Sequence, residues 1–139
     1  VVDRTIQREE THLDQVLDHT GIVSLKAACR GVEVAAHVKD YAVDLVMATQ
    51  PGTSGSHELA TRYVRYGSSP RGAQALVECG RVLALMRGRV NLSIDDIREV
   101  APSVLRHRII LNFDAHADGL TADGILKKIV FSITSAVAA

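Results

Sequence analysis

The stretch from Ser69 to Arg89 constrains the fold of this chain most. Ser69 is a good helix N-cap, and Pro70 suits the first helical position because its missing N–H needs no partner there. Residues 87–89, Arg-Gly-Arg, end the pattern with cations at the negative helix end and a glycine. The stretch therefore predicts a long amphipathic helix. Its apolar face repeats at three and four residues through Ala73, Leu76, Val77, Gly80, Leu83 and Ala84.

Gly80 stands in the middle of this predicted helix, where glycine costs about 1 kcal/mol relative to alanine. We expect it to let a neighbouring helix approach closely.

Three further segments have helical patterns. Residues 35–49 form an apolar face with Tyr41 at its edge, and Thr121 is placed to cap a last helix. Ser93 begins another through a capping-box variant with Asp96 in place of the usual Glu, and this helix, interrupted or restarted at Pro102, ends near residue 105. The apolar residues of the first and last of these helices are Val38, Ala42, Leu45, Val46, Ile125, Leu126, Ile129, Val130 and Ile133.

The remaining segments have weaker patterns. Residues 5–18 are compatible with a short surface helix that Gly21 breaks, and Ser24 can cap a second short helix that Gly31 ends. Residues 51–56 are a loop, which we expect to continue without regular structure to residue 68. Residues 109–111 read as a short strand, followed by a turn at 118–119.

These patterns predict an all-α (mainly α) fold, a small helical bundle with a short strand-like segment. With 139 residues and 47% hydrophobic residues, the chain is long and apolar enough for one domain with a core. It begins at Val1 rather than Met, which suggests a piece of something longer.

Composition weighs against several partners. Sixteen basic residues balance sixteen acidic ones, so phosphate-driven nucleic-acid binding and adsorption to an anionic membrane are both disfavoured. No segment is long and apolar enough to span a membrane.

Cys29 and Cys79 read as two small buried thiols of a cytosolic protein, and the six histidines lack metal-ligand spacing. The chain has no phosphate loop, so we expect no catalytic residue in it. Asp95 and Asp96 are read as helix-capping residues.

Arg71 has the strongest physical argument for a binding role. A cation in the first turn of a helix is unfavourable by roughly 0.3–1 kcal/mol, and an anion would relieve that cost. Together with the free N–H groups of the helix start, its guanidinium suits an oxyanion or a phosphate. The alternative is that Arg71 pairs with a carboxylate or points into water, and position alone slightly favours that alternative.

Arg106, His107 and Arg108 form a second polar cluster, just after a predicted helix end. Their cations can satisfy terminal carbonyls and the helix dipole. From position alone, a role of this cluster in contacting a partner or a nucleotide is the second interpretation, after the structural one.

Several of these segments resemble MoxR-family AAA+ ATPases. Residues 66–72, YGSSPRG, resemble the family's G-[AS]-S-P-R segment, and residues 104–108, VLRHR, resemble its V-L-R-H-R segment. Residues 83–89 and 93–97 are similar to its A-L-x-x-G-R and [VT]-x-x-D-[VI] stretches. Residues 32–49 are similar to its V-x-V…Y-x-x-[DE]-L-V-x-x-T segment, which usually continues with Arg, where this chain has Gln50. The resemblance covers about residues 32–130.

The resemblance implies a C-terminal helical lid, over residues 32–139, that closes over ATP and Mg held by a core lying upstream. Residues 1–31 are then a linker or N-terminal helices from that core. Arg71 would be the sensor arginine that reaches the terminal phosphates, placed by Ser69 and Pro70, and the chain alone should not hydrolyse ATP. The cluster at 106–108 would have an inter-subunit or structural role.

The family also implies partners. Its members commonly form rings and act as cytoplasmic, chaperone-like factors that remodel or mature client proteins, some with von Willebrand A domains. Two other classes stay open: a stand-alone helical interaction module, and a helix-turn-helix DNA binder, which the zero net charge disfavours.

Overall fold

The computed structural model describes residues 14–137, with side chains through Ile133, and within this range it is mainly helical. The predicted fold class is confirmed. The elements in chain order are α2 (His19–Arg30), α3 (Ala36–Ala48), α4 (Glu58–Tyr63), β1 (Val64–Tyr66), α5 (Pro70–Met86), α6 (Ile94–Leu105), β2 (Ile110–Leu111), α7 (Phe113–Ala117) and α8 (Ala122–Val137).

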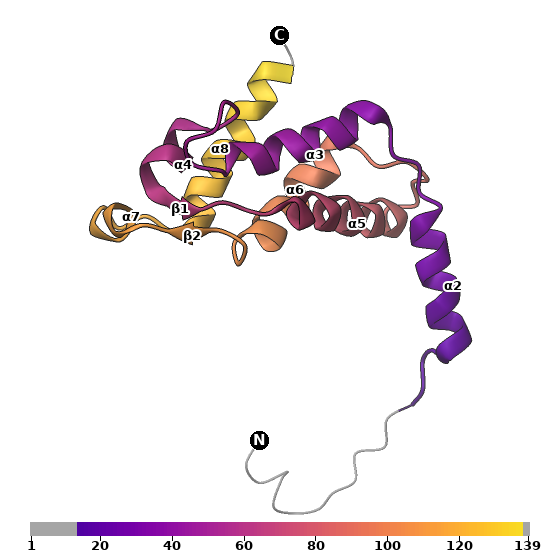
Figure 1. Ribbon diagram of the computed structural model, residues 1–139. Coiled ribbons are helices and arrows are strands. Elements are labelled where there is room, and N and C mark those ends of the chain that lie inside the picture. Colours follow the sequence, from indigo (N-terminus) through magenta and orange to yellow (C-terminus); the bar gives the residue numbers. More distant parts are fainter. Residues whose placement is uncertain (1–13, 138–139) are drawn as a thin grey trace, which may run out of the picture.

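Helices α3, α5, α6 and α8 form the body of the molecule (Figure 1). α5 packs against both α3 and α6, and α8 packs against α3 and α6. The core lies between these helices because each carries an apolar stripe at helical spacing. Its largest fully buried hydrophobic side chains are Tyr41, Leu45, Leu76, Ile97, Leu105, Ile125, Leu126 and Ile129.

α5, α6 and α8 start where their caps were predicted, although Ser69 makes no capping hydrogen bond at α5. Pro70 is the first residue of α5, and Gly88 follows its end with a φ of +69°. Ser93 and Asp96 form the capping box of α6, and the Thr121 hydroxyl accepts a hydrogen bond from the backbone N–H of Gly124. The interruption expected at Pro102 was wrong: α6 continues past it to Leu105, although a proline inside a helix removes one backbone hydrogen bond.

Gly80 has the role expected of it. A Cβ at this position would lie 2.7 Å from Leu92 Cδ1 and 3.3 Å from Ile97 Cδ1. The buried Leu92, which precedes α6, therefore occupies the space that a larger residue would need.

The N-terminal predictions were partly wrong. α2 begins at His19, where the Asp18 carboxylate accepts a hydrogen bond from the Gly21 N–H at 2.7 Å. Gly21 lies inside the first turn, and Ser24 lies within the helix rather than at its cap. Gly31 ends the helix as expected. Residues 14–18 are not helical, and the rest of the weak helix predicted at 5–18 lies outside the described residues.

The segment predicted as a loop to residue 68 instead contains α4 and β1. α4 has six residues, too short for helical periodicity to appear in the sequence. β1 pairs antiparallel with β2, which confirms the short strand, and Val64 lies opposite Leu111. α7 was also missed, although Asn112 caps it by accepting a hydrogen bond from the Ala115 N–H at 3.0 Å.

Neither thiol is fully buried, contrary to expectation. Cys29 is half-buried on α2, and Cys79 is exposed on α5, and both are free. Cys79 points away from the core because it precedes Gly80, which takes the buried position on that turn. No helix within residues 14–137 combines the length and apolar character needed to cross a membrane.

Candidate functional site

The predicted site residues Ser69, Pro70 and Arg71 lie at the start of α5. Ser69 occupies the N-cap position, but its side chain makes no capping hydrogen bond. Arg71 is exposed, and no hydrogen bond or ion pair of its guanidinium is found within residues 14–137. The first turn of α5 contains no acidic residue. Pro70 has no N–H, and the Gly72 N–H donates to the Ser69 carbonyl oxygen at 2.7 Å. The start of α5 therefore combines the positive end of the helix dipole with a guanidinium that has no partner in this range, an arrangement that fits an anionic group.

The turn before α5 is fixed to the end of α3. Thr49 and Gln50 follow α3 directly, and both bind the backbone of Ser68. The Ser68 N–H donates to Thr49 Oγ1 at 3.0 Å, and Gln50 Nε2 donates to the Ser68 carbonyl oxygen at 2.6 Å. Sequence reasoning did not assign Thr49 a role, and it left the role of position 50 in doubt. The only available signal was the threonine that ends the family's V-x-V…T segment.

Two glycines allow the close approach of this turn. A Cβ on Gly67 would collide with the backbone of Thr49, and one on Gly72 would collide with the Ser68 hydroxyl. Ser68 itself is fully buried. The turn therefore fits against α3 and α5 with no room for larger side chains at positions 67 and 72.

The Arg106, His107 and Arg108 cluster lies after α6. Arg106 Nε donates to the Pro102 carbonyl oxygen at 3.1 Å and lies 3.3 Å from Asp123 Oδ1 on α8. Arg106 therefore satisfies a carbonyl of the helix end, which agrees with the structural reading. His107 is exposed, and Arg108 is half-buried. Both line a shallow groove between α5 and α6. No hydrogen bond or ion pair links the cluster to Arg71 in the described part of the chain.

The strongest electrostatic contact is structural. Asp96 is fully buried, and its carboxylate accepts a hydrogen bond from Arg89 Nη1 at 2.8 Å and one from the Ser93 N–H at 3.0 Å. The hydrogen bonds from Arg89 and Ser93 hold the pKa of Asp96 well below its usual value, despite its burial. The capping reading of Asp95 and Asp96 is confirmed for Asp96. Sequence reasoning missed its ion pair with Arg89, because the pairing depends on how the 88–92 turn folds back.

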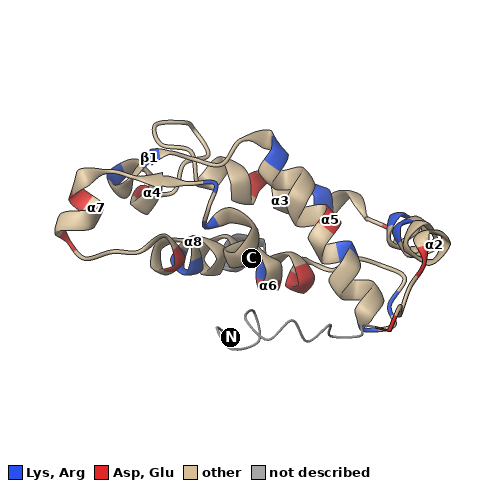
Figure 2. Cartoon of the chain, turned by 90° about the horizontal axis from the view of Figure 1, so that it is seen from below, with Lys and Arg blue, Asp and Glu red and all other residues tan. Residues whose placement is uncertain are grey.

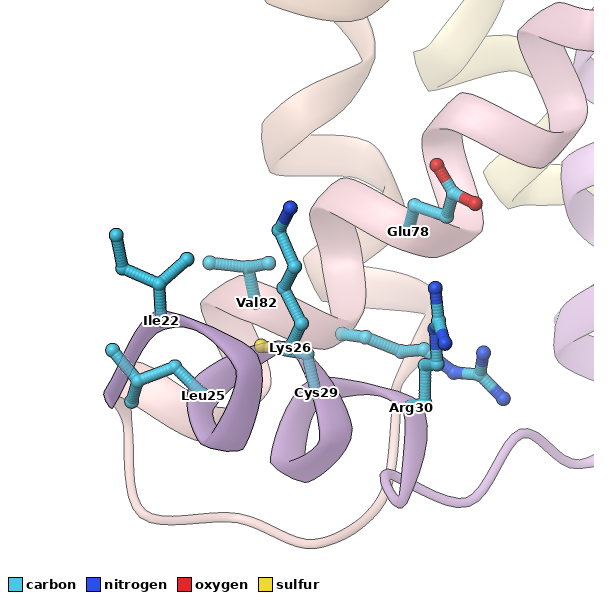
Figure 3. A pocket seen from close by; sticks show the side chains of 8 residues that line it. Ile22, Leu25, Lys26, Cys29, Arg30, Glu78 and Val82 are labelled. Carbon is cyan, nitrogen blue, oxygen red and sulfur yellow. The ribbon is translucent and has the colours of Figure 1, made fainter. Parts of the chain in front are cut away.

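A second groove lies between α2 and α5. Its lining combines apolar side chains, such as Leu25 and Val82, with the charged Lys26 and Glu78 (Figure 3). None of the predicted site residues lines it.

Charge is mixed over the surface. Figure 2 shows basic and acidic residues interspersed along the helices. Within residues 14–137, no group of three or more His, Cys, Asp or Glu side chains is arranged to hold a metal ion.

Comparison with known proteins decides the family. A family model for the AAA lid domain matches residues 56–129, which run from before α4 into α8 and include the turn at Ser68. This chain belongs to the AAA lid domain family. The match covers both Arg71 and the cluster at residues 106–108.

The relatives place the lid in the MoxR type. The chain is 32% identical over 120 residues to the chaperone MoxR1 of Mycobacterium tuberculosis, covering 86% of this chain and 32% of that protein. It is 33% identical over 102 residues to the protein MoxR of Paracoccus denitrificans, covering 70% of this chain and 30% of that protein. The lid thus spans about a third of the length of these relatives.

A solved structure supports the same assignment. The fold matches a crystal structure of a Cytophaga hutchinsonii protein proposed to be an ATPase, with a TM-score of 0.79 and 26% identity. The match covers 93% of this chain and 39% of that one. The resemblance to MoxR-type AAA+ lids that the sequence motifs suggested is therefore confirmed.

Proposed function

We propose that this lid closes over ATP held by the core of a MoxR-type AAA+ ATPase, and that Arg71 is its sensor arginine. The observation that carries the proposal is the exposed guanidinium of Arg71 in the first turn of α5, which has no hydrogen bond or ion pair within residues 14–137. This turn lies in the S-P-R segment of a chain that belongs to the AAA lid family.

The chemistry of this turn suits a terminal phosphate. A guanidinium donates two parallel hydrogen bonds to phosphate oxygens and stays charged at every physiological pH. The positive end of the α5 dipole adds to the attraction for an anion. Ser69 and Pro70 set the direction in which α5 begins, and so the direction in which Arg71 extends.

The core supplies the nucleotide and its Mg ion, together with the phosphate chemistry. On this proposal Arg71 stabilises the closed arrangement only while a terminal phosphate is present, so ATP favours closure and its loss releases the lid. A ligand shifts such an equilibrium only through its differential affinity for the two arrangements. The parent protein would then use this motion within a cytoplasmic ring to remodel client proteins, including partners with von Willebrand A domains.

The domain division belongs to the same proposal. Residues 32–139 would form the lid, and residues 1–31 would connect it to the core. In support, the described core begins at Val32, and α2 buries none of its residues. The mixed surface charge supports a lid that binds neither nucleic acid nor membrane.

For the 106–108 cluster we propose two roles. Arg106 is structural, since it already binds Pro102 and Asp123. His107, which is exposed beside the α5–α6 groove, would contact a neighbouring subunit.

The test of the Arg71 role uses the full-length parent protein. Arg71→Ala should weaken ATP affinity by about 10- to 100-fold, the loss expected for hydrogen bonds to a charged group, and should change ADP affinity little. Arg65→Ala, which removes another exposed arginine on the neighbouring strand, is the matched control and should leave both affinities unchanged. Unchanged turnover and nucleotide affinity in Arg71→Ala would contradict the sensor role.

A further inference from the structure

The end of α3 binds both polar groups of the Ser68 backbone. Thr49 is fully buried, and its hydroxyl donates to the Val46 carbonyl oxygen at 2.7 Å while accepting from the Ser68 N–H at 3.0 Å. The half-buried Gln50 donates from Nε2 to the Ser68 carbonyl oxygen at 2.6 Å. Two consecutive side chains therefore fix one residue, and that residue lies three positions before Arg71.

Tight packing turns this attachment into a positional constraint. The turn cannot slide along α3, because Gly67 lies directly against the backbone of Thr49 and Gln50. It cannot move toward α5 either, because the Ser68 hydroxyl fills the space above Gly72. Close-packed contacts of this kind transmit a shift instead of absorbing it. A change at the end of α3 therefore moves the start of α5 and the side chain that leaves its first turn.

Gln50 donates to the Ser68 carbonyl oxygen through a neutral amide, so this contact holds the turn without placing a charge next to it. The guanidinium of Arg71 has no hydrogen bond or ion pair within residues 14–137, so the position of the helix start is what directs it.

We propose that Gln50 and Thr49 are positioning residues for Arg71: they fix the Gly67–Ser69 turn against α3 and thereby set where the guanidinium meets the terminal phosphate. This inference rests on the proposed function. Neither residue is a nucleotide ligand; both act through Arg71.

The experiment uses the full-length parent protein and compares the affinities for ATP and ADP. Gln50→Met keeps the length and neutrality of the side chain but removes the donor. Thr49→Val keeps the shape but removes the hydroxyl, and Thr49→Ser is its matched control because it keeps the hydroxyl. We expect Gln50→Met and Thr49→Val to weaken ATP binding by about 3- to 10-fold, the loss of one neutral hydrogen bond. ADP affinity should change less than about twofold, and Thr49→Ser should bind both nucleotides normally.

A double-mutant cycle separates positioning from general damage. If Gln50 acts through Arg71, Gln50→Met has no further effect on ATP affinity once Arg71→Ala is present. An equal effect in both backgrounds would overturn the positioning role, as would equal losses of ATP and ADP affinity. Because Gln50 is only half-buried, Gln50→Met carries the test even if Thr49→Val fails to fold, which thermal unfolding would reveal.

The same cycle distinguishes the two proposals. If Arg71→Ala leaves ATP affinity unchanged, the sensor role fails and the positioning role fails with it. If Arg71→Ala weakens ATP binding and Gln50→Met does not, the sensor role stands and only the positioning role is overturned.

Discussion

Helices α2 and α5 are in contact and differ in how much of their surface is buried. α5 contacts α3, α6 and α2, and it buries Gly72, Leu76, Gly80 and Ala84. α2 projects from the edge of the body and buries no residue (Figure 1). α2 starts at a side-chain cap from Asp18, whereas α5 starts at Pro70 with no capping hydrogen bond from Ser69.

The difference shows that capping residues set where a helix begins and ends, whereas burial of its apolar face stabilises it. Ile22, Val23 and Leu25 on α2 are each about half exposed, at 46%, 50% and 50%. Most helical stability in proteins comes from burying an apolar face. α2 packs against α5, and an open groove remains between the two helices. We therefore expect α2 to unfold locally at much lower free energy than the body.

The largest expected effect sharpens this comparison with one substitution made in two helices. Leu45→Ala on α3 removes a fully buried side chain and should lower the free energy of unfolding of the chain by about 2–5 kcal/mol. Leu25→Ala on α2 should change it by less than about 0.5 kcal/mol, because that side chain is half exposed. Chemical denaturation measures both. Similar losses from the two variants would show that α2 belongs to the cooperative core.

The next prediction compares two aspartates that cap helices: Asp96 at α6 in the body of the molecule and Asp18 at α2. Asp96→Asn should lower the free energy of unfolding near pH 7 by about 2 kcal/mol, because it removes the charge that Arg89 pairs with. The pKa of Asp96 is lowered in the folded state, so its contribution is present above about pH 4 and is lost as the pH falls further. The difference between wild type and variant should shrink below that pH.

Asp18→Asn is the matched control for that measurement. Asp18 is exposed and caps α2, and asparagine caps a helix about as well as aspartate. Denaturation curves at a series of pH values should show no comparable loss. A pH-independent difference for Asp96→Asn would mean that its charge contributes little.

The last prediction compares glycines in the two helices. Gly80→Ala should destabilise the chain by about 1–3 kcal/mol, because the new methyl group would lie 2.7 Å from Leu92 Cδ1. Gly21→Ala meets only the far end of Leu17 at 3.0 Å and the Asp18 carboxylate at 3.2 Å. It should be neutral or stabilise α2 by up to about 1 kcal/mol, because alanine is the better helix former. Thermal unfolding and far-UV circular dichroism measure the two effects.

The sequence predicted the long elements well and missed most of the short ones. α3, α5, α6 and α8 span several turns, so their apolar periodicity was visible, and Ser93 and Thr121 marked two of their starts. α4 and α7 have six and five residues, so periodicity had no room to appear. β1 was missed because its three residues are held by pairing with β2, which lies more than 40 positions later.

The candidate site was likewise predicted only in part. The position of Arg71 in the first turn of α5 followed from Ser69 and Pro70, because helix starts are local. The attachment of its turn to Thr49 and Gln50 did not, since those residues lie 18 and 19 positions before Ser68 and no local rule joins them.

The sequence by itself determined the helical bundle, the start of α5 and the motifs that mark a MoxR-type lid, because capping and apolar periodicity act within a few residues. Only the tertiary structure decided which surfaces are covered. It buried Asp96 with Arg89, exposed Cys79, left α2 outside the core, and seated the Ser68 turn on the end of α3. Each of these depends on contacts between distant segments, whose free energy arises only when the whole chain packs.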